Sequence, residues 1–292
     1  MIPLTITDVR ALPGDSAFLI DDGKTAILVD SGFGFTGDTV AANIQKALGT
    51  RPLDYIFLTH SHYDHALGAA YVLHAYPNAC VVAGEYAAKI FAKDSAKALM
   101  RDLDRKFAAT CGVLEYPDRI DALRVDMAVA DGDEIHAGDM TFVAVALPGH
   151  TKCSMGFYLP ETRLLIGTET LGLYDGEDVL FPCYLVGYQM ALDSIAKARS
   201  LAVDNLLLPH FGLLDRERTA YYLDHAALVA TEVTEAIAAI LRAGGTEEAV
   251  IAWFSEHFYR GSIAEGYPID AMRLKTSIMA RVIARELLGT EQ

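Results

Sequence analysis

Short apolar runs alternate with amphipathic stretches over about the first 212 residues. Runs at 16–20 and 24–30 flank Asp21-Asp22-Gly23, and an Asp-Gly step between two such runs predicts a β-hairpin. By the same criteria, strands are expected at 53–58, 80–83, 141–147, 154–159 and 163–166, and helices at 38–48, 66–76, 85–107 and 190–201. This alternation predicts an α+β fold, an αββα sandwich in which helices flank two mixed β-sheets.

The pattern changes after Pro209-His210. Apolar residues then recur at steps of three and four, as in an amphipathic helix, and Gly244-Gly245 ends the series. Two more helices are expected at 246–257 and 270–288. The sequence therefore predicts a domain at 1–214 and a helical C-terminal extension at 215–292 that packs on the core and covers the site.

Composition narrows the class of protein. Hydrophobic residues make up 52% and charged residues 22% of 292, which is typical of a globular chain. No run approaches the roughly 20 apolar residues of a membrane span, and the N-terminus lacks a signal-peptide pattern, so a cytoplasmic protein without a membrane partner is expected. A net charge of −15 disfavours nucleic acid as a partner and leaves a small-molecule substrate. The apolar composition is compatible with a homodimer.

The four cysteines lie far apart and form no C-x-x-C pair. This spacing favours neither a disulfide framework nor a zinc site made of thiolates.

The densest chemistry lies in Thr59-His60-Ser61-His62-Tyr63-Asp64-His65, directly after the apolar run at 53–58. Three of the chain's nine histidines fall in six positions there. Imidazole is the commonest zinc ligand and also suits iron, and carboxylates favour similar ions. In an extended segment His60, His62 and Asp64 share one side and His65 points elsewhere, so the loop could serve two adjacent metals.

Three later residues at strand ends are candidates to complete the coordination. His150 stands in the turn Pro148-Gly149-His150-Thr151, Glu169 follows an apolar strand at 164–168, and His210 follows another at 206–209. Their shared placement at strand ends supports a common role.

The order H-x-H-x-D-H, then His150, a carboxylate and His210, resembles the metallo-β-lactamase-fold superfamily of metallohydrolases. The resemblance covers about residues 16–212 and includes Leu28-Val29-Asp30-Ser31-Gly32 and Asp131-Gly132-Asp133-Glu134-Ile135. It implies that His60, His62 and His150 bind one metal ion and that Asp64, His65 and His210 bind a second, with a carboxylate bridging the two.

Glu169 departs from this family pattern. Most relatives carry a bridging aspartate in a Gly-Asp step, whereas this chain reads Gly167-Thr168-Glu169. A glutamate has one more methylene and could still bridge if the backbone stands back, which is the expectation here. The alternative is that Glu169 does not bridge and one site is weak or empty.

The resemblance implies a binuclear hydrolase. Two divalent ions, zinc first with iron or manganese as alternatives, would activate a shared water as a hydroxide that attacks a small ester, thioester, lactone or phosphoester. Asp64 would bind a metal and orient the hydroxide. The alternatives are a redox enzyme on the same fold, with a di-iron centre as in flavodiiron proteins or the mononuclear iron of a dioxygenase, and a metal-free binding relative.

The loop at 174–188 combines turn residues with aromatic residues and lies between two predicted ligands. Tyr184 or Tyr188 could donate a hydrogen bond to a developing oxyanion. The alternative is that both tyrosines pack the loop against the C-terminal helices.

Overall fold

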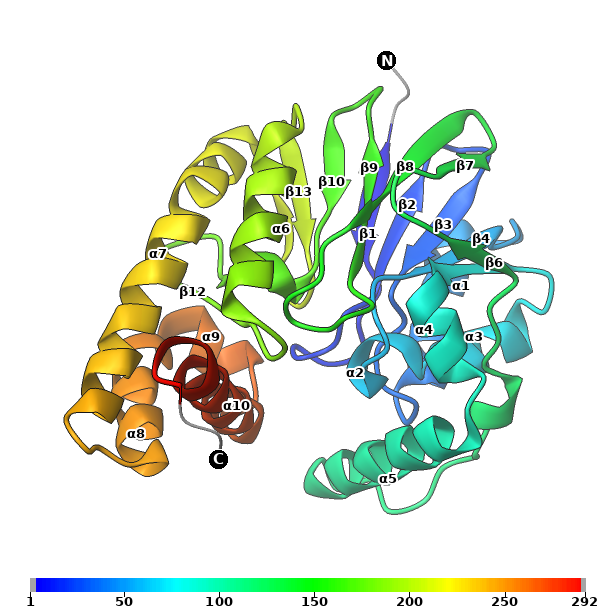
Figure 1. The fold of residues 1–292 in the computed structure, drawn as a ribbon. Coiled ribbons are helices and arrows are strands. Elements are labelled where there is room, and N and C mark those ends of the chain that lie inside the picture. The colour runs from blue at the N-terminus through cyan, green and yellow to red at the C-terminus, as the bar shows by residue number, and fades with distance from the viewer. Residues whose placement is uncertain (1–3, 290–292) are drawn as a thin grey trace. The chain divides into compact units, whose positions relative to one another are not determined.

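The computed structural model describes residues 4–289. These residues form two compact units, which Figure 1 shows in chain colours. The first unit runs up to Ala146 and includes Met155–Thr162, and the second holds Leu147–Ser154 and the chain from Arg163 on. Each unit contributes some of the predicted metal ligands.

The first unit contains a mixed sheet in the order β1-β2-β3-β4-β5-β6. Its first three strands are antiparallel and the pairs from β3 to β6 are parallel. The Asp-Gly hairpin is confirmed, since β2 and β3 pair as antiparallel strands and Gly23 turns the chain with φ of 88°. The strands are β1 (Thr5–Asp8), β2 (Phe18–Asp21), β3 (Ala26–Val29), β4 (Tyr55–Leu58), β5 (Cys80–Gly84) and β6 (Met127–Val129).

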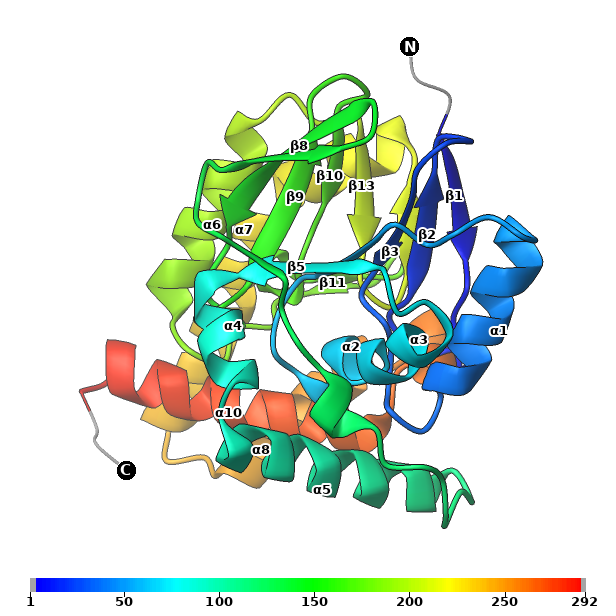
Figure 2. The same ribbon diagram turned by 90° about the vertical axis from the view of Figure 1, so that its right-hand side faces the viewer.

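Helices and a second set of strands complete this unit. Figure 2 shows α1 and α3 side by side, and they pack on each other. The helices are α1 (Gly37–Leu48), α2 (Tyr63–Ala66), α3 (Ala69–Ala75), α4 (Glu85–Phe91), α5 (Asp94–Thr110) and the 3₁₀ turn η1 (Ile120–Ala122). An antiparallel meander is formed by β7 (Glu134–Ala137), β8 (Met140–Ala146) and β9 (Met155–Leu159).

The second unit contains a smaller mixed set of strands. β10 (Leu164–Ile166) and β13 (Asn205–Leu208) are parallel, and β14 (Gly212–Leu214) runs antiparallel to β13. β11 (Leu173–Tyr174) pairs with β12 (Leu180–Phe181). The 3₁₀ turn η2 (Glu169–Leu171) follows β10, and α6 (Tyr188–Ser200) precedes β13.

Four helices follow β14: α7 (Arg216–Arg242), α8 (Glu247–Phe258), α9 (Gly261–Gly266) and α10 (Ile269–Leu287). The Asp215 and Thr246 side chains cap α7 and α8 by accepting hydrogen bonds from backbone N–H groups of the first turn. Helix α10 packs on α7 and α8, as Figure 1 shows at the red end of the chain. The helical C-terminal region is confirmed, α9 was not predicted, and the domain boundary at 214 stays a prediction.

The fold class is confirmed, because mixed sheets are flanked by helices and a helical C-terminal region follows. Among residues 4–289, none of the helices combines the length and the apolar character that crossing a bilayer requires. The four cysteines all lie within the described residues and are free thiols.

Candidate metal centre

The first unit supplies the histidine loop directly after β4. The loop is extended only as far as His62, which precedes α2 with ψ of 147°. The expectation of one extended segment through Asp64 is therefore wrong. The N–H groups of His65 and Ala66 donate to the carbonyl of His62 and wind residues 63–66 into a helical turn.

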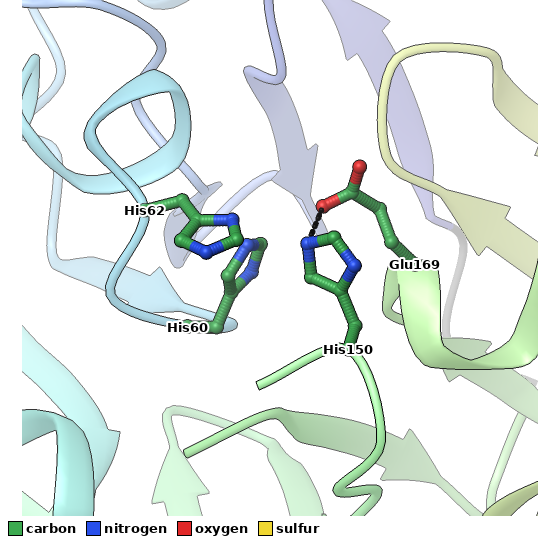
Figure 3. Close-up of side chains that lie close together, drawn as sticks. All are labelled: His60, His62, His150 and Glu169. Carbon is green, nitrogen blue, oxygen red and sulfur yellow. Dashed lines mark ion pairs between the residues drawn. The ribbon is translucent and has the colours of Figure 1, made fainter. Parts of the chain in front are cut away.

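This turn gathers the three imidazoles of the loop. The ring centroid of His60 lies 4.6 Å from that of His62 and 4.0 Å from that of His65. Figure 3 shows His60 and His62 together at the end of their loop. His60 and His65 are fully buried, whereas Asp64 is partly exposed and its Oδ2 lies 3.7 Å from His65 Nε2. The unit thus presents buried imidazoles beside a carboxylate that solvent can reach.

Asp30 holds His65 and the start of the loop. Its Oδ2 contacts His65 Nδ1 at 2.7 Å and accepts from Ser16 Oγ at 3.0 Å. Its Oδ1 accepts from the Thr59 N–H at 2.8 Å, and the Thr59 hydroxyl contacts both oxygens. Asp30 adopts a left-handed backbone, with φ of 52°, which aspartate tolerates better than most residues. One buried carboxylate therefore fixes both the loop and the orientation of a ligand ring.

Two more buried carboxylates hold the segment after Asp30. Asp15 accepts from the Phe33 N–H, and Asp104 on α5 accepts from the N–H groups of Gly34 and Phe35. Burial raises the pKa of Asp15 to about 6, and burial also raises the pKa of Asp104. Both groups support the loop next to the histidines from outside the set of predicted ligands.

In the second unit a sharp turn presents His150. Gly149 has φ of 145°, and a Cβ there would meet the Thr170 methyl at 2.6 Å, so only glycine fits. The His150 N–H donates to Thr170 Oγ1 at 3.0 Å, and His150 Nδ1 donates to the Cys183 carbonyl at 2.8 Å. The ring is fully buried and held in one orientation.

Glu169 lies between the two later histidines. Its Oε2 is 2.8 Å from His150 Nε2, the ion pair drawn in Figure 3, and its Oε1 is 3.4 Å from His210 Nε2. The side chain is fully buried on η2, with two residues between it and the end of the short strand β10. His210 follows β13 with a left-handed φ of 65°. The structure therefore brings together the three predicted ligands of this unit.

Two residues of the C-terminal region, which the sequence analysis did not identify, contact this cluster of Glu169 and the later histidines. Lys275 of α10 donates from Nζ to Glu169 Oε1 at 2.6 Å. Its ammonium also lies 5.1 Å from the ring centroid of Tyr267, whose ring packs 5.6 Å from that of His210. In the sequence Lys275 is one of several basic residues on an amphipathic helix, and no local pattern distinguishes it.

These contacts shift the pKa values of the buried groups. Burial raises the pKa of Glu169, but His150 and Lys275 outweigh it and hold the value well below its usual range. Burial lowers the pKa of His150, but Glu169 outweighs it and the result is about 10. Without metal, His150 and Glu169 therefore form an ion pair, and a metal ion that takes His150 Nε2 must displace its proton.

Both candidate substrate-loop tyrosines contact helix α7. The Tyr184 hydroxyl lies 2.5 Å from Thr234 Oγ1, and the Tyr188 hydroxyl donates to Thr231 Oγ1 at 3.1 Å. Tyr184 is buried, and burial raises its pKa. These contacts favour packing against the C-terminal helices, and a role in binding an oxyanion stays a prediction.

The donor set fits a divalent transition metal. Nδ1 of His60, His65 and His150 contacts Thr59 Oγ1, Asp30 Oδ2 and the Cys183 carbonyl, at 3.1, 2.7 and 2.8 Å respectively. Such contacts orient a metal-binding histidine and leave Nε2 as the ring atom for the metal. Imidazole nitrogens with carboxylates suit zinc, iron and manganese.

Comparison with known proteins identifies the family of the chain. The family model of the metallo-beta-lactamase superfamily matches residues 13–251, which covers most of the chain. The chain belongs to the metallo-beta-lactamase superfamily. The match includes every predicted ligand and extends through α7 into α8.

Two of the curated relatives that the chain resembles are named hydroxyacylglutathione hydrolase. The chain is 29% identical over 175 residues to a hydroxyacylglutathione hydrolase of Ruegeria pomeroyi, which covers 58% of this chain and 53% of the relative. It is 24% identical over 226 residues to hydroxyacylglutathione hydrolase 1 of Vibrio vulnificus, covering 76% and 72%. A glyoxylase B2 of Dictyostelium discoideum is 24% identical, covering 55% and 53%. The chain thus spans about half the length of two of these relatives.

Solved structures of the superfamily share the fold. A metallo-beta-lactamase family protein of Thermus thermophilus matches with a TM-score of 0.63 and 18% identity, covering 97% of this chain and 93% of that one. An archaeal superfamily protein of Sulfolobus tokodaii matches with a TM-score of 0.56 and 20% identity, covering 73% and 81%. At these identities the likeness concerns the fold.

Proposed function

We propose that the protein is a metal-dependent hydrolase that binds two divalent ions, with zinc as the first candidate. The observation that carries the proposal is the set of buried imidazoles whose Nδ1 atoms are held by protein oxygens, accompanied by Asp64 and Glu169. Membership of the superfamily supports the same assignment.

His60, His62 and His150 would hold one ion, and Asp64, His65 and His210 the other. Glu169 would contribute to both, because one of its oxygens lies near His150 and the other near His210. When bound, the ions would supply an activated water and polarise the reacting oxygen of the substrate.

Residues of this chain would organise that chemistry. Asp30 and the Cys183 carbonyl keep two of the rings oriented. Asp64, which is 15% exposed, could accept a hydrogen bond from the attacking water and so orient it. No serine or cysteine nucleophile is needed in this scheme.

The substrate class proposed is a small ester, thioester, lactone or phosphoester. Relatives named hydroxyacylglutathione hydrolase make a thioester the first class to test. The net charge of −15 disfavours polyanionic substrates such as nucleic acid.

The first experiment is elemental analysis of protein purified anaerobically without chelators, followed by assays on a panel of the four substrate classes. Zinc or manganese, with turnover that a chelator abolishes and added metal restores, is the expected result. Iron together with oxygen consumption would favour the redox alternative instead. Turnover that survives complete metal removal would refute the proposal.

Glu169→Gln tests whether the carboxylate of Glu169 binds metal. The amide keeps the size of the side chain but lacks the charge that favours metal binding, so we expect fewer bound ions per chain and lower activity. Glu232→Gln, at an exposed position on α7, is the matched control. Unchanged metal content and activity in Glu169→Gln would remove Glu169 from the set of ligands.

A further inference from the structure

Helix α10 places a cation against the carboxylate that the metal centre would use. Lys275 Nζ lies 2.6 Å from Glu169 Oε1, and its side chain is only 14% exposed. We propose that Lys275 weakens the second metal site by holding the Glu169 oxygen beside His210, so that the two ions bind with unequal affinity. This inference rests on the proposed function, because it concerns the same ligands.

The two oxygens of Glu169 are not equivalent. Oε2 lies 2.8 Å from His150 Nε2, on the side of the first proposed site. Oε1 lies 3.4 Å from His210 Nε2, on the side of the second, and is the oxygen that Lys275 contacts. A metal ion approaching Oε1 must share that oxygen with an ammonium or displace it. At Oε2 the neighbour is His150, which is itself a proposed ligand of the incoming ion.

Packing keeps the ammonium in place. The next residue on α10, Thr276, is buried, as are Met272 and Met279 on the same helix. Helix α10 packs on α7 and α8. The ring of Tyr267 lies 5.1 Å from the ammonium and adds a cation–π contact. Moving Lys275 away would take a partner from the buried Glu169 charge, which is costly.

The consequence is stepwise metal binding. The first ion binds beside His150, and the second binds more weakly because its carboxylate oxygen already pairs with a cation. Hydrogen bonds to charged groups contribute enough free energy to change a dissociation constant by about tenfold or more. The position of Lys275 therefore determines whether the protein carries one ion or two at a given zinc concentration.

The test is calorimetric titration of metal-free protein with zinc alone, comparing wild type with Lys275→Met. In the variant we expect the second dissociation constant to fall by about tenfold or more, while the first changes little. Lys275→Arg keeps the charge and should keep the second step weak. Arg273→Met removes a charge from an exposed position of the same helix and should match wild type.

The titration distinguishes a failure of the proposed function from a failure of the inference about Lys275. If wild type binds no zinc, the proposed function fails together with this inference. If Lys275→Met binds zinc with the same two constants as wild type, or more weakly at both sites, only this inference fails. Should Lys275→Met not fold, as judged by circular dichroism, Lys275→Gln replaces it, with the same tightening expected and the same results overturning the inference.

Discussion

At Asp30 one buried carboxylate joins a strand end, the histidine loop and the His65 ring. Its oxygens bind the Thr59 N–H and hydroxyl, the Ser16 hydroxyl and His65 Nδ1. In the proposed centre such a residue would act on metal binding without touching the metal, because it sets the direction of the His65 ring.

Asp30→Asn should therefore lower metal affinity by about 10- to 100-fold. The amide oxygen can still accept hydrogen bonds, but the NH₂ group that replaces the other oxygen cannot, so asparagine cannot accept from both the Thr59 N–H and His65 Nδ1 on separate atoms as Asp30 does. Zinc affinity measured by competition with a chelator checks this. Asp121→Asn, whose side chain is 90% exposed, is the control. An unchanged affinity in Asp30→Asn, with the fold intact, would show that Asp30 does not orient His65.

The burial of Asp15 predicts how the stability of the protein depends on pH. Burial raises its pKa to about 6 in the folded state, against 3.8 for an ordinary aspartate. The folded protein therefore keeps a proton that the unfolded chain loses, and the contribution of Asp15 to stability grows as pH falls through 6 and is complete below 3.8. The rise of the pKa from 3.8 to about 6 adds about 3 kcal/mol to the free energy of unfolding once the contribution is complete.

The measurement is denaturant unfolding of wild type and Asp15→Asn between pH 7 and pH 4, because the variant has no titrating group at this position. The free energy of unfolding of wild type should rise relative to the variant as the pH falls. A difference that stays flat, or that changes in the opposite direction, would mean that Asp15 does not titrate in this range.

The sequence was sufficient to identify candidate ligands that carry their own chemical signature. His60, His62, Asp64 and His65 stand in one motif, and His150, Glu169 and His210 lie in the segments that follow β8, β10 and β13. Lys275 and Tyr267 could not be predicted, because they reach Glu169 and His210 only through the packing of α10 and the turn before it. Long-range packing of this kind leaves no local pattern in a sequence.

At the scale of elements, the break between α2 and α3 positions the histidine loop. The sequence predicted one helix over 66–76, but the chain forms two helices separated at Leu67 and Gly68. Gly68 approaches the backbone of Ser31, and its N–H donates to the Gly32 carbonyl. Ser31 in turn binds the His65 carbonyl through its N–H and its hydroxyl. A periodic pattern could not reveal this close approach of two segments.

Gly68→Ala should consequently destabilise the protein strongly. A Cβ at Gly68 would lie 1.9 Å from the Ser31 carbonyl oxygen, so backbone must move, and we expect a loss of more than about 3 kcal/mol. Gly112→Ala is the comparison, because it has φ of 80° and no atom within 4 Å, which leaves only a backbone cost of about 1–2 kcal/mol. Thermal or denaturant unfolding measures both. Equal losses in the two variants would contradict the proposed contact.

At the scale of the whole molecule, binding of the proposed ions is linked to the stability of the folded chain, because an ion that binds only the folded state stabilises it. Ligand binding stabilises a folded protein by about 2.7 kcal/mol per site when the free ligand is at 100 times its dissociation constant.

We therefore expect zinc to raise the melting temperature of metal-free wild type, and a ligand substitution in either unit to reduce that rise. His62→Ala tests the first unit and His210→Ala the second, with melting followed by calorimetry with and without zinc. His74→Ala, at an exposed position outside the motif, should keep the full rise. A full rise in either ligand variant would remove that histidine from the proposed set of ligands. Because melting is measured without substrate, this result would test the proposed ligands whichever substrate class the protein hydrolyses.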